Sequence, residues 1–400
     1  MVADTRSRPQ SEPVTPVAQA FSPVENEAPL RWSRRLRLVP NDGLGAVRRA
    51  VFFALLTWLP IAVWAFVTGR APGADSGESL LQHYGVHVRC LVVIPLLILA
   101  EPMLHRTAKA IAARMAATAA TAADTRARFD AVGRDLTRLR DASLPWVLAI
   151  GLAIAWSLTD DPKSHGDAMA WAIEAGDTLG FGGWWFAYVV RPVFFVLLLG
   201  WLWRILLVTY WFWRVGKIDL ALVPTHPDRA GGLAFVEKLP GAFALVSVAL
   251  SATMASRWAH EILHHGASFA SYGRTIVVFV ALWSLLMLLP LLAFSTLFGR
   301  VRATSIAAYS ALVGRQGWLV HRRWIHGEAV GADPILDAPE IGPVADAAAM
   351  YEAVTRMRRL PIAKASLATI ILPLALPLVL VAALQIPLKD LLLKLVKLLV

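Results

Sequence analysis

Seven long apolar stretches dominate this sequence of 400 residues. A helix needs about 20 predominantly apolar residues to cross the hydrocarbon layer of a membrane. Stretches of about this size occur near residues 50–67, 86–104, 144–158, 184–210, 241–258, 275–298 and 362–384. We therefore expect an all-α fold, a polytopic bundle of about seven transmembrane helices. The third stretch is the shortest, and the charges of the flanking loops favour its crossing.

The composition excludes several other classes of protein. Hydrophobic residues make up 57% of the chain and charged residues only 17%, whereas soluble domains have roughly 45–50% and 25%. An ordinary soluble, disordered or collagenous protein is thereby excluded. The single cysteine, Cys90, allows neither an internal disulfide nor a cysteine zinc site.

Lysine and arginine are distributed unequally between the two sets of loops, and such residues are retained in the cytoplasm. One set, which includes the N-terminal segment, holds most of them, and the loop after the third span is acidic. The other set has few: Arg70, Arg89, Lys163, Arg257 and Arg274. We expect a cytoplasmic N-terminus and an external C-terminus. The net charge of +11 then reflects topology, and nucleic-acid binding is a poor explanation of it.

The pattern divides the chain into four parts: a disordered, basic tail over 1–47, a six-span bundle over 48–299 with a cytoplasmic helical hairpin at 105–143, a cytoplasmic loop over 300–361, and a seventh span with an amphipathic helix over 362–400. Residues 1–30 have few large apolar groups, which predicts disorder. The basic cluster at 31–37 is placed to lie on anionic lipid head groups, with a specific lipid or partner site as the alternative. The first apolar run is too long for a signal peptide, so we expect it to remain as an anchor.

Residues 105–141 lack proline and contain one glycine, Gly133, so they should be helical. The 300–361 loop is interrupted by Gly327, Gly331, Pro334, Pro339 and Pro343, and it is at the lower size limit for independent folding. A large catalytic domain is therefore excluded. The Leu/Lys-rich residues 388–400 predict an amphipathic helix that lies on the outer leaflet of the same membrane.

The sharpest local motif is HEILHH, comprising His260, Glu261, His264 and His265. On a helix, His260 and His264 share a face and could bind zinc, with Glu261 as general base. The candidate further ligands are His83, His87, His165 and the acidic loop. The resemblance to membrane zinc proteases is confined to these residues. The alternatives are a structural metal site or simply a polar helix end, and zinc is the one candidate cofactor.

A second motif, THPDRAGGL at residues 225–233, lies between the fourth and fifth spans. Pro227 and the preceding Pro224 fix an extended turn, and Gly231 and Gly232 allow close backbone approach. Beside His226 and Arg229, such a loop could hold an anion or carry a proton. The other interpretation, which we favour, is a structural turn of the chain at the membrane surface. The candidate ligand residues are Thr225, His226, Asp228, Arg229, Gly231 and Gly232.

Ionisable residues inside spans are costly, so they are candidates for function. Glu101 and Arg204 are expected near the cytoplasmic ends of their spans, and Arg191 and Arg89 near the outer ends. We predict that Glu101 and Arg204 can form an intramembrane pair. Snorkelling of these side chains toward the membrane surface is the alternative.

The THPDRAGGL motif after a Trp-rich span, the stretch ILDAPEIGPVAD at 335–346 and the amphipathic C-terminal end resemble a family of uncharacterised bacterial inner-membrane proteins. The resemblance implies location in a bacterial inner membrane and gives weight to the residues of the THPDRAGGL motif. It implies no activity.

Three functions follow as hypotheses. A transport, channel-like or channel-regulating role leads, because the chain is mostly a bundle that contains polar residues. A membrane scaffold or sensor that binds partners through its cytoplasmic loops is the second, and a zinc-dependent membrane hydrolase the third. The bilayer with anionic head groups and a second copy of the chain are the candidate partners.

Overall fold

The computed structural model describes residues 21–40, 43–70, 79–119, 122–159, 169, 171–174, 178–328 and 342–385. In these ranges the protein is a helical bundle, and its only sheet there is the small hairpin of β1 (Ile173–Glu174) and β2 (Thr178–Leu179). The helices are α1 (Ala28–Arg35), α2 (Ala46–Val67), α3 (Tyr84–Val88), α4 (Ile94–Leu99), α5 (Glu101–Ala119), α6 (Ala123–Asp141), α7 (Leu144–Thr159), α8 (Phe181–Trp185), α9 (Arg191–Val215), α10 (Ala244–His264), α11 (Gly273–Leu292), α12 (Ser295–Val320), α13 (Gly342–Thr355) and α14 (Lys364–Ala382).

Within the described residues, seven helical segments are long and apolar enough to cross a membrane, and each contains most or all of one predicted span. Several consist of consecutive helices, such as α3 to α5 over Tyr84–Ala119. The short third span is α7, and it continues directly from α6, the returning arm of the predicted hairpin. The protein is therefore an integral, multi-pass membrane protein, as the sequence predicted.

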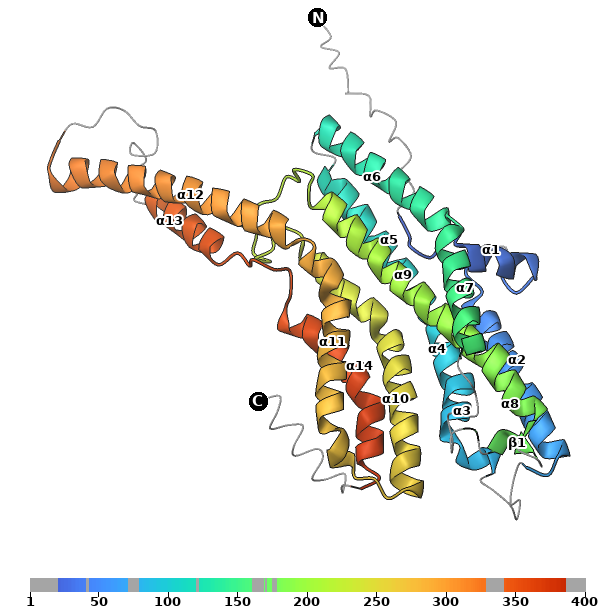
Figure 1. The fold of residues 1–400 in the computed structure, drawn as a ribbon. Helices are drawn as coiled ribbons and strands as arrows, with labels where there is room; N and C mark the ends of the chain where they lie inside the picture. The colour runs from blue at the N-terminus through green and yellow to red at the C-terminus, as the bar shows by residue number, and fades with distance from the viewer. Residues whose placement is uncertain are drawn as a thin grey trace, which may run out of the picture.

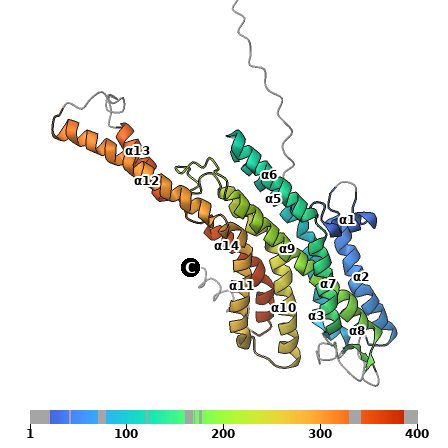
Figure 2. The ribbon, with the colours of Figure 1, turned by 45° about the horizontal axis from the view of Figure 1, so that its top comes forward.

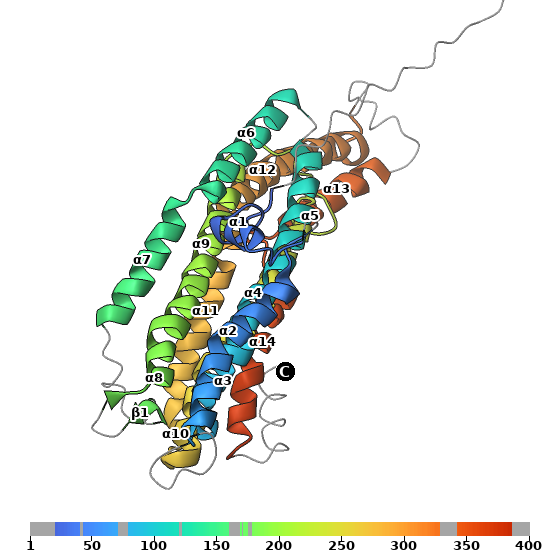
Figure 3. The ribbon, with the colours of Figure 1, turned by 90° about the vertical axis from the view of Figure 1, so that its right-hand side faces the viewer.

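The spans form two neighbouring groups (Figure 1). One contains α2, α3 to α5, α7 and α8 to α9, and the other contains α10, α11 and α14. Figure 3 shows the same spans from the side. We call the end of the bundle at which α2 begins the N-terminal end, and the end that carries β1 and β2 the opposite end. The hairpin of α5 and α6 extends beyond the N-terminal end.

Prolines shape the first group of spans. Pro60 in α2 has no N–H, which leaves the Leu56 carbonyl without its helical partner, and the Trp185 indole N–H donates to it at 3.1 Å. Pro95 and Pro192 each follow a π-helical turn, over Arg89–Val93 and Phe186–Val190. A proline ring clashes with the carbonyl four residues earlier, and that carbonyl lies inside each π turn, so the wider turn relieves the clash.

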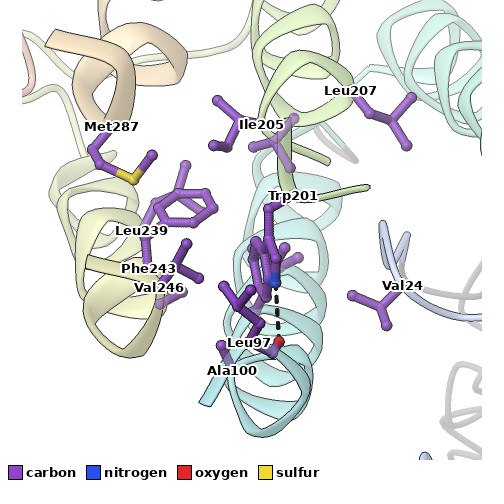
Figure 4. Packing of buried hydrophobic residues seen from close by; sticks show 14 of the residues in the cluster. Val24, Leu97, Ala100, Trp201, Ile205, Leu207, Leu239, Phe243, Val246 and Met287 are labelled. Carbon is purple, nitrogen blue, oxygen red and sulfur yellow. Dashed lines mark hydrogen bonds between the residues drawn. The ribbon is translucent and has the colours of Figure 1, made fainter. Parts of the chain in front are cut away.

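The two groups meet in an apolar core (Figure 4). Trp201 of α9 is fully buried between Leu97 of α4 and Phe243, which ends the 3-10 helix Ala234–Phe243. Its indole N–H donates to the Leu97 carbonyl at 2.9 Å. That bond satisfies a backbone group where α4 stops and α5 restarts at Glu101, with Pro102 at its second position. The core thus fixes Glu101 at a helix start.

The predicted disorder over residues 1–30 is wrong for residues 21–30. Residues 21–30 fold against the bundle, and α1 begins among them at Ala28 and ends at Arg35. Val24 and Leu30 are almost completely buried. Even a few apolar side chains can anchor a segment when a polar residue between them, here Glu27, also has a partner in the bundle. We call residues 21–40 the N-terminal segment. Residues 1–20 lie outside the described ranges.

The region 300–361, predicted as a loop, is largely helical in its described part. In its described part, α12 continues in helical form from the end of the sixth span to Ile325, and α13 packs back along it. The Ala-rich stretch 303–311 favours a helix, and the prolines that suggested a loop are confined to residues 334–343. Figure 2 shows this helical arm projecting away from the bundle. The predicted C-terminal amphipathic helix lies outside the described residues.

Candidate functional site

Four charged side chains meet at the N-terminal end of the first group of spans. Arg49 comes from the first turn of α2, Glu101 from the start of α5, Arg204 from the middle of α9, and Glu27 from the N-terminal segment. Gly45 lies directly before α2 with φ of +56°, and a Cβ there would lie 2.9 Å from the Leu38 carbonyl oxygen. This tight turn allows the N-terminal segment to fold back over α2. We call these four residues the charge network.

The four residues of the charge network form ion pairs with one another. The Arg204 guanidinium donates to Glu101 at 2.9 Å, which confirms the predicted pair, and it donates twice to Glu27, from Nε at 3.0 Å and from Nη2 at 2.7 Å. Arg49 forms an ion pair with the other oxygen of Glu101. All four side chains are at most 3% exposed. The indole ring of Trp201 lies 5.0 Å from the Arg204 guanidinium carbon.

The remaining contacts of the N-terminal segment hold it on the α5–α6 hairpin. Arg140 donates to the Ser22 carbonyl at 2.9 Å, and the Ser22 hydroxyl and His105 Nδ1 are 2.8 Å apart. Glu25 pairs with Lys109 at 2.9 Å at the surface. The segment is therefore joined to the bundle by one buried carboxylate, Glu27, and by several contacts around it.

Glu27 is the member of the charge network that lies outside the spans. Burial raises the pKa of its carboxyl, and the attraction of Arg204 only partly opposes this, so the pKa rises from its ordinary value of 4.5 to about 7. The neighbouring charge of Glu101 adds to the rise, whereas Arg140 lowers it. The contact between Glu27 and the bundle, and with it the docking of the N-terminal segment, thus depends on pH near neutrality.

A second set of charges lies toward the opposite end, where both π turns occur. The guanidinium carbon of Arg89 lies 5.3 Å from the ring centres of Phe186 and Phe194, and that of Arg191 lies 5.7 Å from Phe186. Arg191 is 8% exposed. Arginines therefore occur at two depths of the bundle, because Arg191 and Arg204 are 13 residues, or roughly 20 Å, apart along one helix.

The THPDRAGGL motif forms a turn that its own aspartate fills. Asp228 accepts hydrogen bonds from the N–H groups of Ala230, Gly232 and Ala234 at 2.8–3.1 Å. Burial raises the pKa of Asp228, but these three bonds outweigh it and lower the pKa below its ordinary value. The backbone groups that would hold an external anion are thus already occupied, which favours the structural interpretation of the motif.

The other residues of the motif tie the turn to the chain before the last span. The Arg229 carbonyl accepts from the N–H of Arg358 at 2.9 Å, and φ is positive at Arg229, Gly231 and Gly232. His226 Nδ1 lies 2.9 Å from Asp228, and Thr225 is half-buried in the same turn. The turn therefore positions the segment between α13 and α14.

The HEILHH motif ends α10 at the opposite end of the bundle. Ring centres of His260 and His264 are 4.7 Å apart, His265 lies 5.7 Å and His83 5.1 Å from His260. We call these four residues the histidine cluster. Glu261 instead receives hydrogen bonds from the Tyr272 hydroxyl and from Arg257, the latter at 3.1 Å. The proposed general base is thus held by other groups.

Metal binding by the motif gains no support from this arrangement. Among the described residues, no group of three or more His, Cys, Asp or Glu side chains is placed to hold a metal ion. His165, a predicted further ligand, lies outside the described residues. The histidine cluster forms the polar end of α10.

Sequence reasoning missed Glu27 and Arg49 as members of the site. The signal for Glu27 was a carboxylate flanked by apolar residues, Val24 and Leu30, within an otherwise polar tail. For Arg49 it was a position directly before the apolar stretch 50–67, where the helix of the span begins one turn earlier. Comparison of the chain with protein-family models, with curated proteins and with solved structures found no match.

Proposed function

We propose that this protein is a transport or channel-like protein of the bacterial inner membrane that admits a small anion, with the N-terminal segment as its closure on the cytoplasmic side. The charge network supports this proposal most directly. Charged residues within spans commonly mark the path of a transported solute, and here they connect three spans and a segment outside them.

Glu27 occupies Arg204 in the manner of a bound anion. Two donors of one guanidinium, Nε and Nη2, engage its carboxylate, and arginine recognises carboxylates and phosphates of ligands in this way. When Glu27 leaves, Arg49 and Arg204 share only Glu101, so the site carries one net positive charge. An anionic solute can then take the place of Glu27, and Arg191 and Arg89 lie further along the same bundle.

The proposal is tested by flux measurements on the full chain in proteoliposomes, with radiolabelled chloride, phosphate and lactate as probes. Glu27→Lys places a like charge against Arg204 and weakens the closure, so it should raise the flux of at least one anion several-fold over the wild type. Arg204→Gln should abolish that flux, and Arg204→Lys should retain part of it. The matched control is Glu25→Lys, which breaks only a surface ion pair and should leave the flux unchanged.

The proposal would be overturned if none of the three anions crossed faster than in protein-free liposomes, in both the wild type and Glu27→Lys. An equal rise in potassium flux would also overturn it, because the path would then not select anions.

A second candidate function, a scaffold that binds partners, is favoured by the projecting arm of α12 and α13. Trp318 is 57% and Ile325 70% exposed on this arm, which projects away from the bundle (Figure 2). Ala308→Cys in the exposed middle of α12 tests self-association, since Cys90 is buried. Disulfide-linked dimers in native membranes would support a scaffold built from copies of the chain, whereas monomers alone would contradict it.

A further inference from the structure

A cavity of about 420 Å³ lies outside the charge network, among α5, α6, α9 and the first residue of the N-terminal segment. Its walls include Phe21, Phe129 and Trp211, together with Arg134 and Arg138. Small-molecule sites typically have volumes of about 300–1,000 Å³ and apolar walls with a few polar groups. The cavity therefore has the size and composition of a ligand site.

The inner part of the cavity is aromatic. Trp211 is 1% and Phe21 6% exposed, and their ring centres are 5.1 Å apart. Ala112 and Ala116 form a smooth wall on α5 without bulky side chains. Flat aromatic rings pack well against such surfaces, in stacked or edge-on geometry. The inner part thus suits a planar ring.

The rim of the cavity is positively charged. Arg134 and Arg138 lie one turn apart on α6, both exposed, and within the described chain neither has an acidic partner. Other arginines of the same helix do have one: Arg126 pairs with Asp130, Arg128 with Asp124, and Arg140 with Asp141. Asp130, the acidic residue of the wall, is thereby neutralised. The two guanidiniums are left to meet an anionic group from outside the chain.

The position of the cavity favours a ligand from the aqueous phase over a lipid. Ala112 and Ala116 lie eight and twelve residues beyond Leu104, the end of the apolar stretch, which is roughly 12–18 Å along the helix. The intervening turns carry Arg106 and Lys109, which do not reside in hydrocarbon. The cavity thus lies beyond the hydrocarbon layer.

We propose that this cavity binds a small aromatic anion, with the ring between Phe129 and Trp211 and the anionic group at Arg134 and Arg138. Because Phe21 forms part of the wall, the bound ligand contacts the N-terminal segment six residues from Glu27. The ligand stabilises the docked segment, since it binds the docked form and not the open one.

Isothermal titration calorimetry on the full chain in lipid nanodiscs tests the site with two matched pairs of probes. The anions are adenosine 5′-monophosphate and indole-3-acetate, and their uncharged counterparts are adenosine and indole-3-ethanol. We expect at least one anion to bind, and its counterpart to bind at least tenfold more weakly, a difference of about 1.4 kcal/mol.

The double variant Arg134→Gln/Arg138→Gln should weaken binding of that anion at least tenfold. A matched control with the same loss of charge, Arg106→Gln/Arg128→Gln, should bind as the wild type does, because neither residue lines the cavity. Phe129→Ala should weaken the binding of the anion and of its uncharged counterpart to the same extent. Binding of neither anion, equal binding of the uncharged counterpart, or binding unchanged in Arg134→Gln/Arg138→Gln would overturn the proposal.

Discussion

The charge network and the histidine cluster both gather ionisable residues at the ends of spans, yet they differ in how they are built. The charge network draws one residue from each of four segments, and its side chains are buried and paired. The histidine cluster draws three of its four residues from one helix end, and His264 and His265 are exposed. A local motif is easy to see in a sequence, whereas a buried site needs convergence of distant segments.

The largest effect should follow from Glu101→Gln, which leaves two buried arginines with only Glu27. Removing one partner of a buried ion pair typically costs about 3–5 kcal/mol. We expect a loss of this size in the free energy of unfolding, measured by thermal unfolding in detergent. Glu352→Gln, at an exposed pair with Arg356, is the control. Equal stability of both variants would show that the charge network is as unimportant as a surface pair.

A smaller effect should follow from Asp228→Ala, which frees three backbone N–H groups in the THPDRAGGL turn. We expect a loss of roughly 1–3 kcal/mol in the free energy of unfolding. Because the pKa of Asp228 is lowered in the folded state, this contribution is present above its ordinary pKa of 3.8 and is lost as the pH falls. Asp219→Ala, at an exposed aspartate before the turn, should leave the unfolding temperature unchanged. A stable Asp228→Ala variant would return the motif to the anion-site hypothesis.

The third prediction concerns pH and the N-terminal segment. The pKa of Glu27 is raised on docking, so docking is strongest below pH 4.5 and weakens as the pH rises through about 7. Between pH 6 and 8 the population of the open segment should rise about tenfold. Hydrogen exchange of residues 21–40, corrected for intrinsic rates, measures this. Glu27→Gln should remove the pH dependence, and its persistence in that variant would assign it to another group.

The smallest effect is expected at the histidine cluster. Glu261→Gln removes a half-exposed charge from Tyr272 and Arg257, which should cost no more than about 1 kcal/mol. Elemental analysis of protein purified without a His-tag should find zinc below one equivalent per chain. Stoichiometric zinc that is lost in His260→Ala/His264→Ala would reverse the comparison and make the cluster a metal site.

The spans could be predicted because apolar length alone determines them. The pair of Glu101 and Arg204 was predictable for a related reason, since two opposite charges near the same ends of spans have few other partners. Glu27 could not be found in this way. The average composition of residues 1–30 predicts disorder, and only the three-dimensional position of Arg204, 177 residues later, shows what holds the segment.

Two further differences have local causes. The THPDRAGGL motif was predicted as a turn, but the sequence could not show that Asp228 would accept its N–H groups in place of an external anion. The 300–361 region contains both strong helix-forming and helix-breaking residues, and their separation along the chain decides that α12 extends to Val320. In each case the relevant information is the partner or the boundary of a segment, and composition does not carry it.

The distance in sequence between Glu27 and Arg204 also determines the order of assembly during synthesis. Glu27 is made 177 residues before its partner, which at 5–20 residues per second is an interval of roughly 10–35 s. During that time the first spans enter the membrane while Arg49 and Glu101 have only each other. The N-terminal segment docks on Arg204 after α9 has been inserted, so a segment that is translated before all seven spans is among the last to reach its final position.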